Sequence, residues 1–426
     1  MGDGIDAKEP EPFSYDRDYV VLLSDWTDEN PTRVLAKLKK QSDYYNQHKR
    51  TVGDFIDDVS EMGWSAAVAD RKMWAEMKMS PTDLADVSGY TYTYLMNGQA
   101  PDGNWTGIFK PGEKIRLRFI NASAMTYFDV RIPGLKMTVV AADGLHVKPV
   151  SVDEFRIAVA ETYDVIIEPD SEQAYTVFAQ SMDRTGYARG TLAVQEGLSA
   201  PVPSPDPRPL IAMGDMGMDH GSMGGMDHGS MAGMDHGSMR GGMAGMAGMA
   251  GAMQAHPASE TNNPLVDMQT MTPTHKLDDP GIGLRDNGRR VLTYSDLRST
   301  FLDPDGREPS RTIELHLTGH MEKFSWSFDG IKFSDAEPLR LKYGERVRIT
   351  LVNDTMMAHP IHLHGMWSDL EDANGNFLVR KHTIDMPPGS KRSYRVTADA
   401  LGRWAYHCHL LLHMEMGMFR EVRVDE

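Results

Sequence analysis

The sequence predicts an all-β protein with two β-sandwich domains, a helical insertion near the N-terminus and a disordered, Met-rich segment. Three observations support this prediction. Between residues 90 and 194, short apolar stretches with strand-like alternation are separated by Pro-Gly and Asp-Gly turns. Similar stretches return after residue 276. Between these two regions, residues 199–275 have too much glycine and too few bulky apolar residues to form a core.

The first sandwich domain is expected over residues 13–198. Residues 1–12 are polar and read as a tail. A short apolar run at 19–23 predicts a buried strand, and residues 30–87 predict helices because Val34, Leu35 and Leu38 recur at helical spacing. Further strands are expected at 114–120, 137–142, 154–159, 163–167 and 175–179.

The segment 199–275 begins Pro-rich and then repeats Met-Asp-His-Gly-Ser-Met at 218–223, 226–231 and 234–239. Thioethers select Cu(I), and the neighbouring histidines extend the preference to Cu(II). We therefore interpret the repeat as a flexible copper-collecting segment rather than an incidental linker. Its candidate ligands are Met218, His220, Met223, Met226, His228, Met231, Met234, His236 and Met239.

The second sandwich domain is expected over residues 276–426, with strands at 311–317, 345–352 and 393–396. Composition limits the possible partners of the whole chain. Its 44 basic and 61 acidic residues give a net charge of −17, which argues against nucleic-acid binding. The apolar runs are too short to predict a transmembrane helix, and no signal peptide is visible.

The C-terminal stretch 402–418 contains the one cysteine, Cys408, between His407 and His409. On a strand, the two histidines point to one face and the cysteine to the other. Cys408, His413 and Met418 offer a thiolate, an imidazole and a weak axial thioether, which is a blue-copper set short of one imidazole.

A second histidine motif supplies that imidazole. His362 and His364 lie two apart and share one face of an extended segment, whereas His359 can point elsewhere and complete the set with Cys408. His362 and His364 then face a shared space with His407 and His409, and four neutral imidazoles suit copper.

These two motifs resemble the C-terminal copper signatures of multicopper oxidases, and stretches at 15–26, 81–86, 92–98 and 155–164 resemble the bacterial copper-resistance members. The resemblance implies cupredoxin-like Greek-key domains, with a middle domain free of copper ligands at 13–198. It also implies a periplasmic oxidase that takes electrons from Cu(I) or a phenolic substrate and reduces dioxygen to water. The implied ligands are His359, Cys408, His413 and Met418 for type 1 copper, His362 for type 2, and His364, His407 and His409 for type 3.

The resemblance also implies two further His-x-His pairs from an N-terminal domain, and the sequence contains none besides 362/364 and 407/409. We therefore expect half of a trinuclear site. Truncation of the sequence, a second polypeptide and a degenerate oxidase all account for this. A protein that only binds or sequesters copper is the alternative function. The other histidines, including His316 and His320, are expected to be structural or solvated.

Other methionines have two interpretations. In the stretch from Met73 to Met79, Met73 and Met77 lie one helical turn apart and could share a face with Glu76 or Trp74. A methionine stripe at helical spacing more often indicates core packing than a metal site. Met356, Met357, Met414 and Met416 flank the type 1 candidates, as either a Cu(I) entry site or a soft apolar wall.

Overall fold

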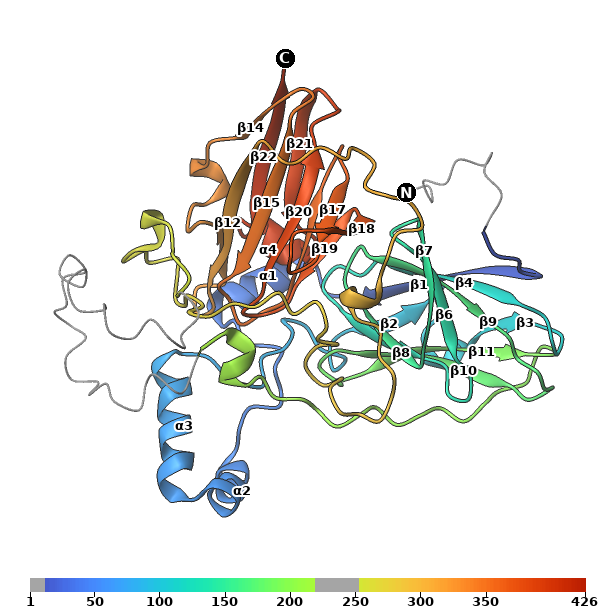
Figure 1. Ribbon diagram of the computed structural model, residues 1–426. Coiled ribbons are helices and arrows are strands. Elements are labelled where there is room, and N and C mark those ends of the chain that lie inside the picture. The colour runs from blue at the N-terminus through green and yellow to red at the C-terminus, as the bar shows by residue number, and fades with distance from the viewer. Residues whose placement is uncertain (1–11, 219–252) are drawn as a thin grey trace.

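The computed structural model describes residues 12–218 and 253–426, and it contains two β-sandwiches (Figure 1). The all-β prediction is confirmed. In each sandwich a six-stranded sheet packs against a five-stranded sheet. The six-stranded sheets have corresponding strand orders, β2-β1-β4-β9-β6-β7 and β13-β12-β15-β20-β17-β18, so the two domains share one topology.

The N-terminal sandwich is built from the first eleven strands. Their bounds are β1 Arg17–Trp26, β2 Thr93–Met96, β3 Trp105–Ile108, β4 Ile115–Asn121, β5 Phe128–Arg131, β6 Met137–Ala142, β7 Leu145–Val152, β8 Glu154–Ile157, β9 Thr162–Ile167, β10 Tyr175–Ser181 and β11 Tyr187–Ala193. Strand β1 pairs in parallel with β4, and β4 pairs antiparallel with β9. Strands β5 and β10 are buried along their whole length, which places the core between the sheets.

The C-terminal sandwich holds the other eleven strands. Their bounds are β12 Arg311–His320, β13 Ser325–Phe328, β14 Leu339–Lys342, β15 Arg346–Asn353, β16 His359–Leu363, β17 Ser368–Glu371, β18 Phe377–Lys381, β19 Thr383–Met386, β20 Lys391–Thr397, β21 Gly402–Cys408 and β22 Phe419–Asp425. The five-stranded sheet has the order β14-β22-β21-β16-β19, which puts the two histidine-bearing strands β16 and β21 side by side.

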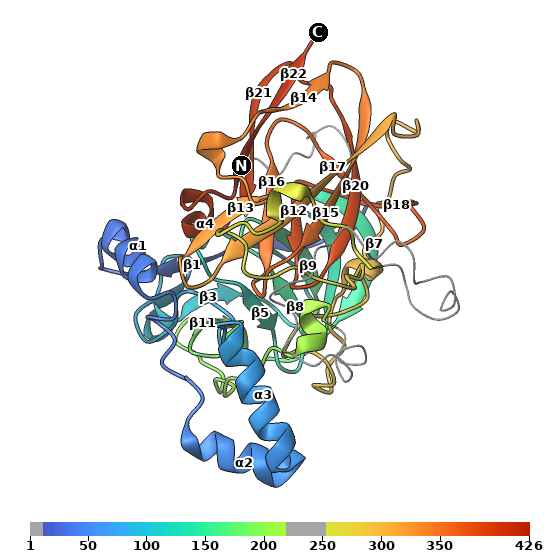
Figure 2. The ribbon, with the colours of Figure 1, turned by 90° about the vertical axis from the view of Figure 1, so that its left-hand side faces the viewer.

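The predicted helical region contains α1 Pro31–Lys40, α2 Val52–Met62 and α3 Trp64–Glu76. Asn30 caps α1, whereas a capping box at Thr51 and Asp54 starts α2. Helices α2 and α3 extend away from both sandwiches (Figure 2). After α3 the chain leaves helical conformation, and residues 78–87 return to the protein body. The short helix α4, Leu411–Glu415, follows β21. Within residues 12–218 and 253–426, no helix is long and apolar enough to cross a membrane.

The segment between the sandwiches differs from the expectation of disorder over 199–275. Residues 219–252 lie outside the described part, but the chain on both sides of them is packed. Met213, Met216 and Met268 are buried, and Thr270 donates a hydrogen bond from its hydroxyl to the carbonyl oxygen of Met216. Residues 199–218 and 253–275 carry enough apolar side chains to pack. The average composition of the whole segment 199–275 does not reveal this.

The boundary expected at residue 276 also differs from the structure. Residues 276–300 contact both sandwiches. Val291 bridges to Glu154 and Ser299 bridges to Val147 in the first sandwich, whereas Leu378 of the second accepts from the Ser299 amide and Arg392 of the second donates to the Lys276 carbonyl. Leu284 and Leu297 are buried. The second sandwich begins with β12.

A buried ion-pair network joins the sandwiches close to β16 and β21. The Lys381 ammonium lies 3.0 Å from an Asp143 oxygen and 3.1 Å from a Glu161 oxygen, and all three side chains are almost fully buried. The Tyr127 hydroxyl donates to Asp385 at 2.8 Å. These contacts hold the N-terminal sandwich against the sheet that carries the histidines.

Candidate metal centre

The register of β16 and β21 explains how two groups of ligands lie back to back. In the antiparallel pairing, Ile361 is opposite Cys408 and His362 is opposite His407. Because directly opposite residues share a face, Cys408 lies on the face of Ile361 and of His359 two residues earlier. His362 and His407 lie on the other face.

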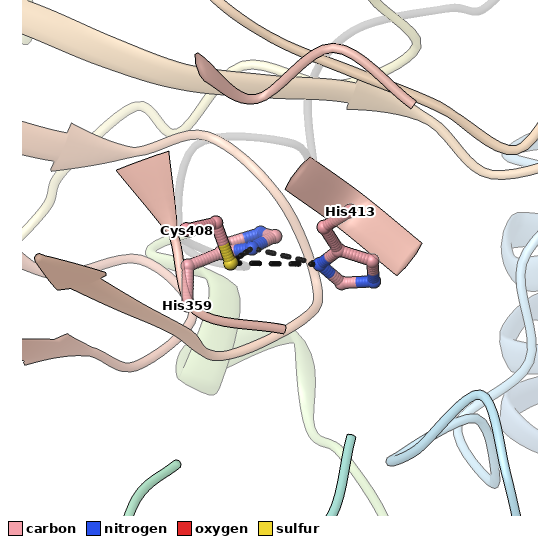
Figure 3. Close-up of side chains that lie close together, drawn as sticks. All are labelled: His359, Cys408 and His413. Carbon is pink, nitrogen blue, oxygen red and sulfur yellow. Dashed lines mark hydrogen bonds between the residues drawn. The ribbon is translucent and has the colours of Figure 1, made fainter. Parts of the chain in front are cut away.

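His359, Cys408 and His413 come together on the inner face (Figure 3). The Cys408 sulfur lies 3.6 Å from His359 Nδ1 and 4.0 Å from His413 Nδ1, and the two Nδ1 atoms are 3.1 Å apart. All three side chains are fully buried. One sulfur and two ring nitrogens therefore converge on a point that solvent does not reach.

Met418, the expected axial ligand, is also fully buried. The turn around α4 brings the backbone of Met418 next to those of Cys408 and His413. The amide of Cys408 donates to the Met418 carbonyl, and the amide of Met418 donates to the His413 carbonyl. The Trp326 ring stacks on His413 with centroids 4.0 Å apart and fixes the plane of the imidazole.

The outer nitrogens of both imidazoles have hydrogen-bond partners. His413 Nε2 lies 2.7 Å from the Asp86 carboxylate, and His359 Nε2 lies 2.7 Å from the Thr355 hydroxyl oxygen. Donation from Nε2 leaves each Nδ1 lone pair directed at Cys408, the arrangement that metal-binding histidines use. Asp86 is 327 positions from His413 in sequence, so no sequence signal identified it.

The donor set fits copper. Thiolate, imidazole and thioether are soft or borderline ligands, and a sulfur with two imidazoles and a weak axial methionine is typical of blue-copper sites. Burial lowers the pKa of His359 well below its ordinary value, which keeps that imidazole neutral. Burial also raises the pKa of the Cys408 thiol well above its ordinary value, so a bound cation must displace its proton.

The other four predicted histidines meet on the opposite face. His364 Nε2 and His407 Nε2 are 3.1 Å apart, and the His362 ring centroid lies 6.0 Å from that of His407 and 5.8 Å from that of His409. His364 is exposed, whereas His362 and His407 are buried.

The ring nitrogens in this group are oriented for binding. His362 Nδ1 donates to the His382 carbonyl at 2.7 Å and His407 Nδ1 donates to the Cys408 carbonyl at 2.9 Å, so the lone pair for a metal is on Nε2 in each ring. His409 Nδ1 is buried without a hydrogen-bond partner. Burial lowers the pKa of His362 to about 3 and that of His409 to about 4, so both imidazoles are neutral at physiological pH.

Most methionine candidates lie elsewhere. Met218 is partly buried against the core, and the remaining repeat ligands, from His220 to Met239, lie outside the described residues. Met356 and Met357 are buried, and Met73 and Met77 pack against the core. Sequence reasoning missed a second ligand-rich group, His256, Glu260, His316 and Asp354, whose ligand atoms lie within 4.8 Å of one another. Its members are scattered over 99 positions without a motif.

Comparison with known proteins matches residues 17–197 and 306–426 to two family models, each described as multicopper oxidase. A copper resistance protein A homolog of Pseudomonas syringae pv. tomato is 75% identical over 99% of this chain and 73% of its own length. The copper resistance protein A of Escherichia coli is 74% identical over 99% of this chain and 74% of its length. This chain thus spans about three quarters of these relatives.

Among solved structures, that of Fet3p, titled a multicopper oxidase that functions in iron import, matches with a TM-score of 0.57. The match covers 97% of this chain and 67% of Fet3p at 15% identity, which is similarity of fold alone.

Proposed function

We propose that this chain, which belongs to the multicopper oxidase family and to its copper resistance protein A group, binds copper in two adjacent sites of its C-terminal sandwich and moves electrons between them. Family membership makes copper ions its cofactors and copper-dependent oxidation its chemistry. Bound copper would supply the reversible Cu(I)/Cu(II) one-electron step that this chemistry needs.

The proposed type 1 ligands are His359, Cys408, His413 and Met418. The observation that carries this proposal is the convergence of one buried sulfur and two buried Nδ1 atoms within 4.0 Å of one another. Trp326 and Asp86 hold His413 in place, which limits ligand movement between the two oxidation states.

The proposed oxygen-reducing site takes His362 as a type 2 ligand and His364, His407 and His409 as type 3 ligands. Cys408 is covalently bonded in the chain to both His407 and His409, so the backbone provides a direct path from the type 1 site. Dioxygen is the proposed electron acceptor, and the exposed His364 leaves this face open to it.

The proposed electron donor is Cu(I) or a small phenol. The Met-Asp-His-Gly-Ser-Met repeats support Cu(I), because thioethers prefer the reduced ion. A role in copper resistance and a periplasmic location belong to the same proposal. Cell fractionation with an antibody to the chain tests the location, and a signal in the cytoplasmic fraction alone contradicts it.

Four histidines make half of a trinuclear site, and we propose that two further His-x-His pairs come from a polypeptide region outside this sequence. The open face at His364 is where such a region would dock. Adding that region to the chain is expected to raise bound copper and to start oxygen uptake. No change on addition contradicts the proposal.

Cys408→Ser tests the type 1 assignment directly. The serine oxygen cannot replace the thiolate, so the intense blue absorption of the copper-loaded chain should disappear, and oxygen uptake in the presence of the completing region should fall to background. His275→Gln is a matched control, since it removes a histidine outside both sites. A blue, active Cys408→Ser protein contradicts the assignment.

The second candidate function is copper binding without oxidase activity. It is favoured by one observation: the sequence has two His-x-His pairs and no more. Counting copper per chain while following oxygen uptake separates the two functions. Tightly bound copper with no oxygen uptake, in the presence of the completing region, supports sequestration.

A further inference from the structure

A second buried cluster lies on the C-terminal sandwich, away from the proposed copper ligands. His316 is on β12, and Asp354 directly follows β15. Glu260 ends the short turn Ala258–Glu260, and His256 lies two residues before that turn. His256 Nδ1 is 3.3 Å from both a Glu260 oxygen and an Asp354 oxygen. His316 Nδ1 is 2.6 Å from Asp354 and 3.7 Å from Glu260.

Both imidazoles are anchored by their outer nitrogens. His256 Nε2 lies 3.0 Å from the carbonyl oxygen of Thr270, and His316 Nε2 lies 3.3 Å from a Glu314 carboxylate oxygen. Donation from Nε2 in each ring leaves both Nδ1 atoms pointing at the carboxylates. Metal-binding histidines are held in this way, with the outer N–H given to a carbonyl or a carboxylate.

Both carboxylates of the cluster are buried. Glu260 is 3% exposed and Asp354 is 1% exposed. Glu260 Oε2 accepts from Gln269 Nε2, whereas both Asp354 oxygens have partners, Oδ1 the Thr270 amide and Oδ2 the His316 Nδ1 at 2.6 Å. Glu260 Oε1 and His256 Nδ1, however, have no hydrogen-bond partner. Buried polar atoms rarely remain unpaired in a folded protein, so these two point to a ligand between them.

The charges of the cluster are balanced within it. In the part of the chain that the structure describes, Glu260 and Asp354 form ion pairs with the two imidazoles and with no lysine or arginine. In the metal-free chain, contacts with Asp354 and Glu260 outweigh burial and raise the pKa of His256 to about 10 and that of His316 above its ordinary value. Protons on the imidazoles therefore balance the carboxylates, and a bound divalent ion would take the place of those protons.

We propose that His256, Glu260, His316 and Asp354 bind one divalent transition-metal ion, with Cu²⁺ held most tightly. Two imidazoles and two carboxylates suit borderline ions such as Cu²⁺ and Zn²⁺. Mg²⁺ and Ca²⁺ prefer oxygen alone, and Cu(I) prefers sulfur. Among divalent first-row ions, affinity at such a site is highest for Cu²⁺.

The site is separate from the type 1 candidates but next to them in the chain. Asp354 precedes Thr355, whose hydroxyl oxygen accepts from His359 Nε2 at 2.7 Å. Thr355 thus connects the proposed ion site to His359. None of the four proposed ligands of this ion belongs to the type 1 site or to the oxygen-reducing site proposed above.

Metal counting tests the proposal on the full chain. The wild type, His256→Gln and Glu260→Gln are loaded with Cu²⁺, desalted and analysed for copper per chain, with His320→Gln as the matched control on β12. We expect each cluster variant to bind one ion fewer than the wild type and the control to equal the wild type. The blue absorption of Cys408 serves as an internal check of folding in every variant. Equal copper in the wild type and a blue cluster variant overturns the proposal.

Cobalt provides a second measurement that does not depend on the proposed function. Co²⁺ is titrated into Cys408→Ser and into Cys408→Ser with Glu260→Gln. We expect one additional set of visible d–d bands, without thiolate charge transfer, in the protein that keeps Glu260. Identical spectra show that the imidazoles carry protons as counter-charges instead of a metal, and they overturn the proposal even if the copper variants fail to fold.

Discussion

Asp86→Asn isolates the electrostatic effect of a carboxylate that lies outside the proposed type 1 ligands. Asp86 is buried and bonded to His413 Nε2 at 2.7 Å. The amide keeps an oxygen that accepts the same N–H, so the imidazole stays in place while one negative charge is removed. Losing that charge destabilises Cu(II) relative to Cu(I), and the reduction potential should rise.

The size of the shift follows from distance. A carboxylate on the outer nitrogen of an imidazole lies ~7 Å from an ion on the inner nitrogen, where unit charges interact by ~2.4 kcal/mol at an effective dielectric constant of ~20. One elementary charge moved through ~100 mV gains ~2.3 kcal/mol, so the expected rise is of the order of 100 mV. Asp86→Ala also removes the anchor of His413, and copper affinity should fall ~10–100-fold.

The assay is a redox titration followed through the blue absorption. Asp83→Asn is the matched control, because Asp83 is a buried carboxylate in the same segment that bonds Asn46 instead of a histidine. A rise in Asp86→Asn no larger than that in the control refutes the argument. So does an unchanged copper affinity in Asp86→Ala.

Two further predictions concern stability. The folded chain keeps His362 and His409 neutral down to a pKa of about 3 and about 4, whereas the unfolded chain binds protons there below pH 6.5. The free energy of unfolding of the metal-free protein should therefore decrease as pH falls from 6.5 to 4, as measured by urea denaturation. A variant with both histidines changed to glutamine should show a weaker decrease, and an equal decrease contradicts the assignment. Lys381→Met leaves Asp143 and Glu161 buried without their cation and should cost ~3–5 kcal/mol of unfolding free energy, while Lys136→Met, a more exposed pair, should cost under ~1 kcal/mol. Equal costs for the two lysine variants refute the claim that burial makes the difference.

The strand pattern of both sandwiches was predictable because alternation and turn residues are local. The strand expected at 114–120 is β4, and those expected at 163–167 and 175–179 fall within β9 and β10. The helical region was too long at its C-terminal end. Residues 78–87 are not helical, and this non-helical segment brings Asp86 to His413. The end of the helical region thus coincides with a tertiary contact, which the spacing of apolar residues cannot predict.

The two histidine motifs were identifiable from sequence because their spacing fixes which face of a strand each side chain occupies. Cys408 between His407 and His409, and His362 two before His364, specify two faces wherever β16 and β21 pair. The tertiary structure alone decided which distant groups support them. Asp86 reaches His413 across the two sandwiches, and His256, Glu260, His316 and Asp354 meet although they are far apart in the chain. Alternation is a property of the local backbone, whereas such meetings depend on how the sheets and connecting segments pack.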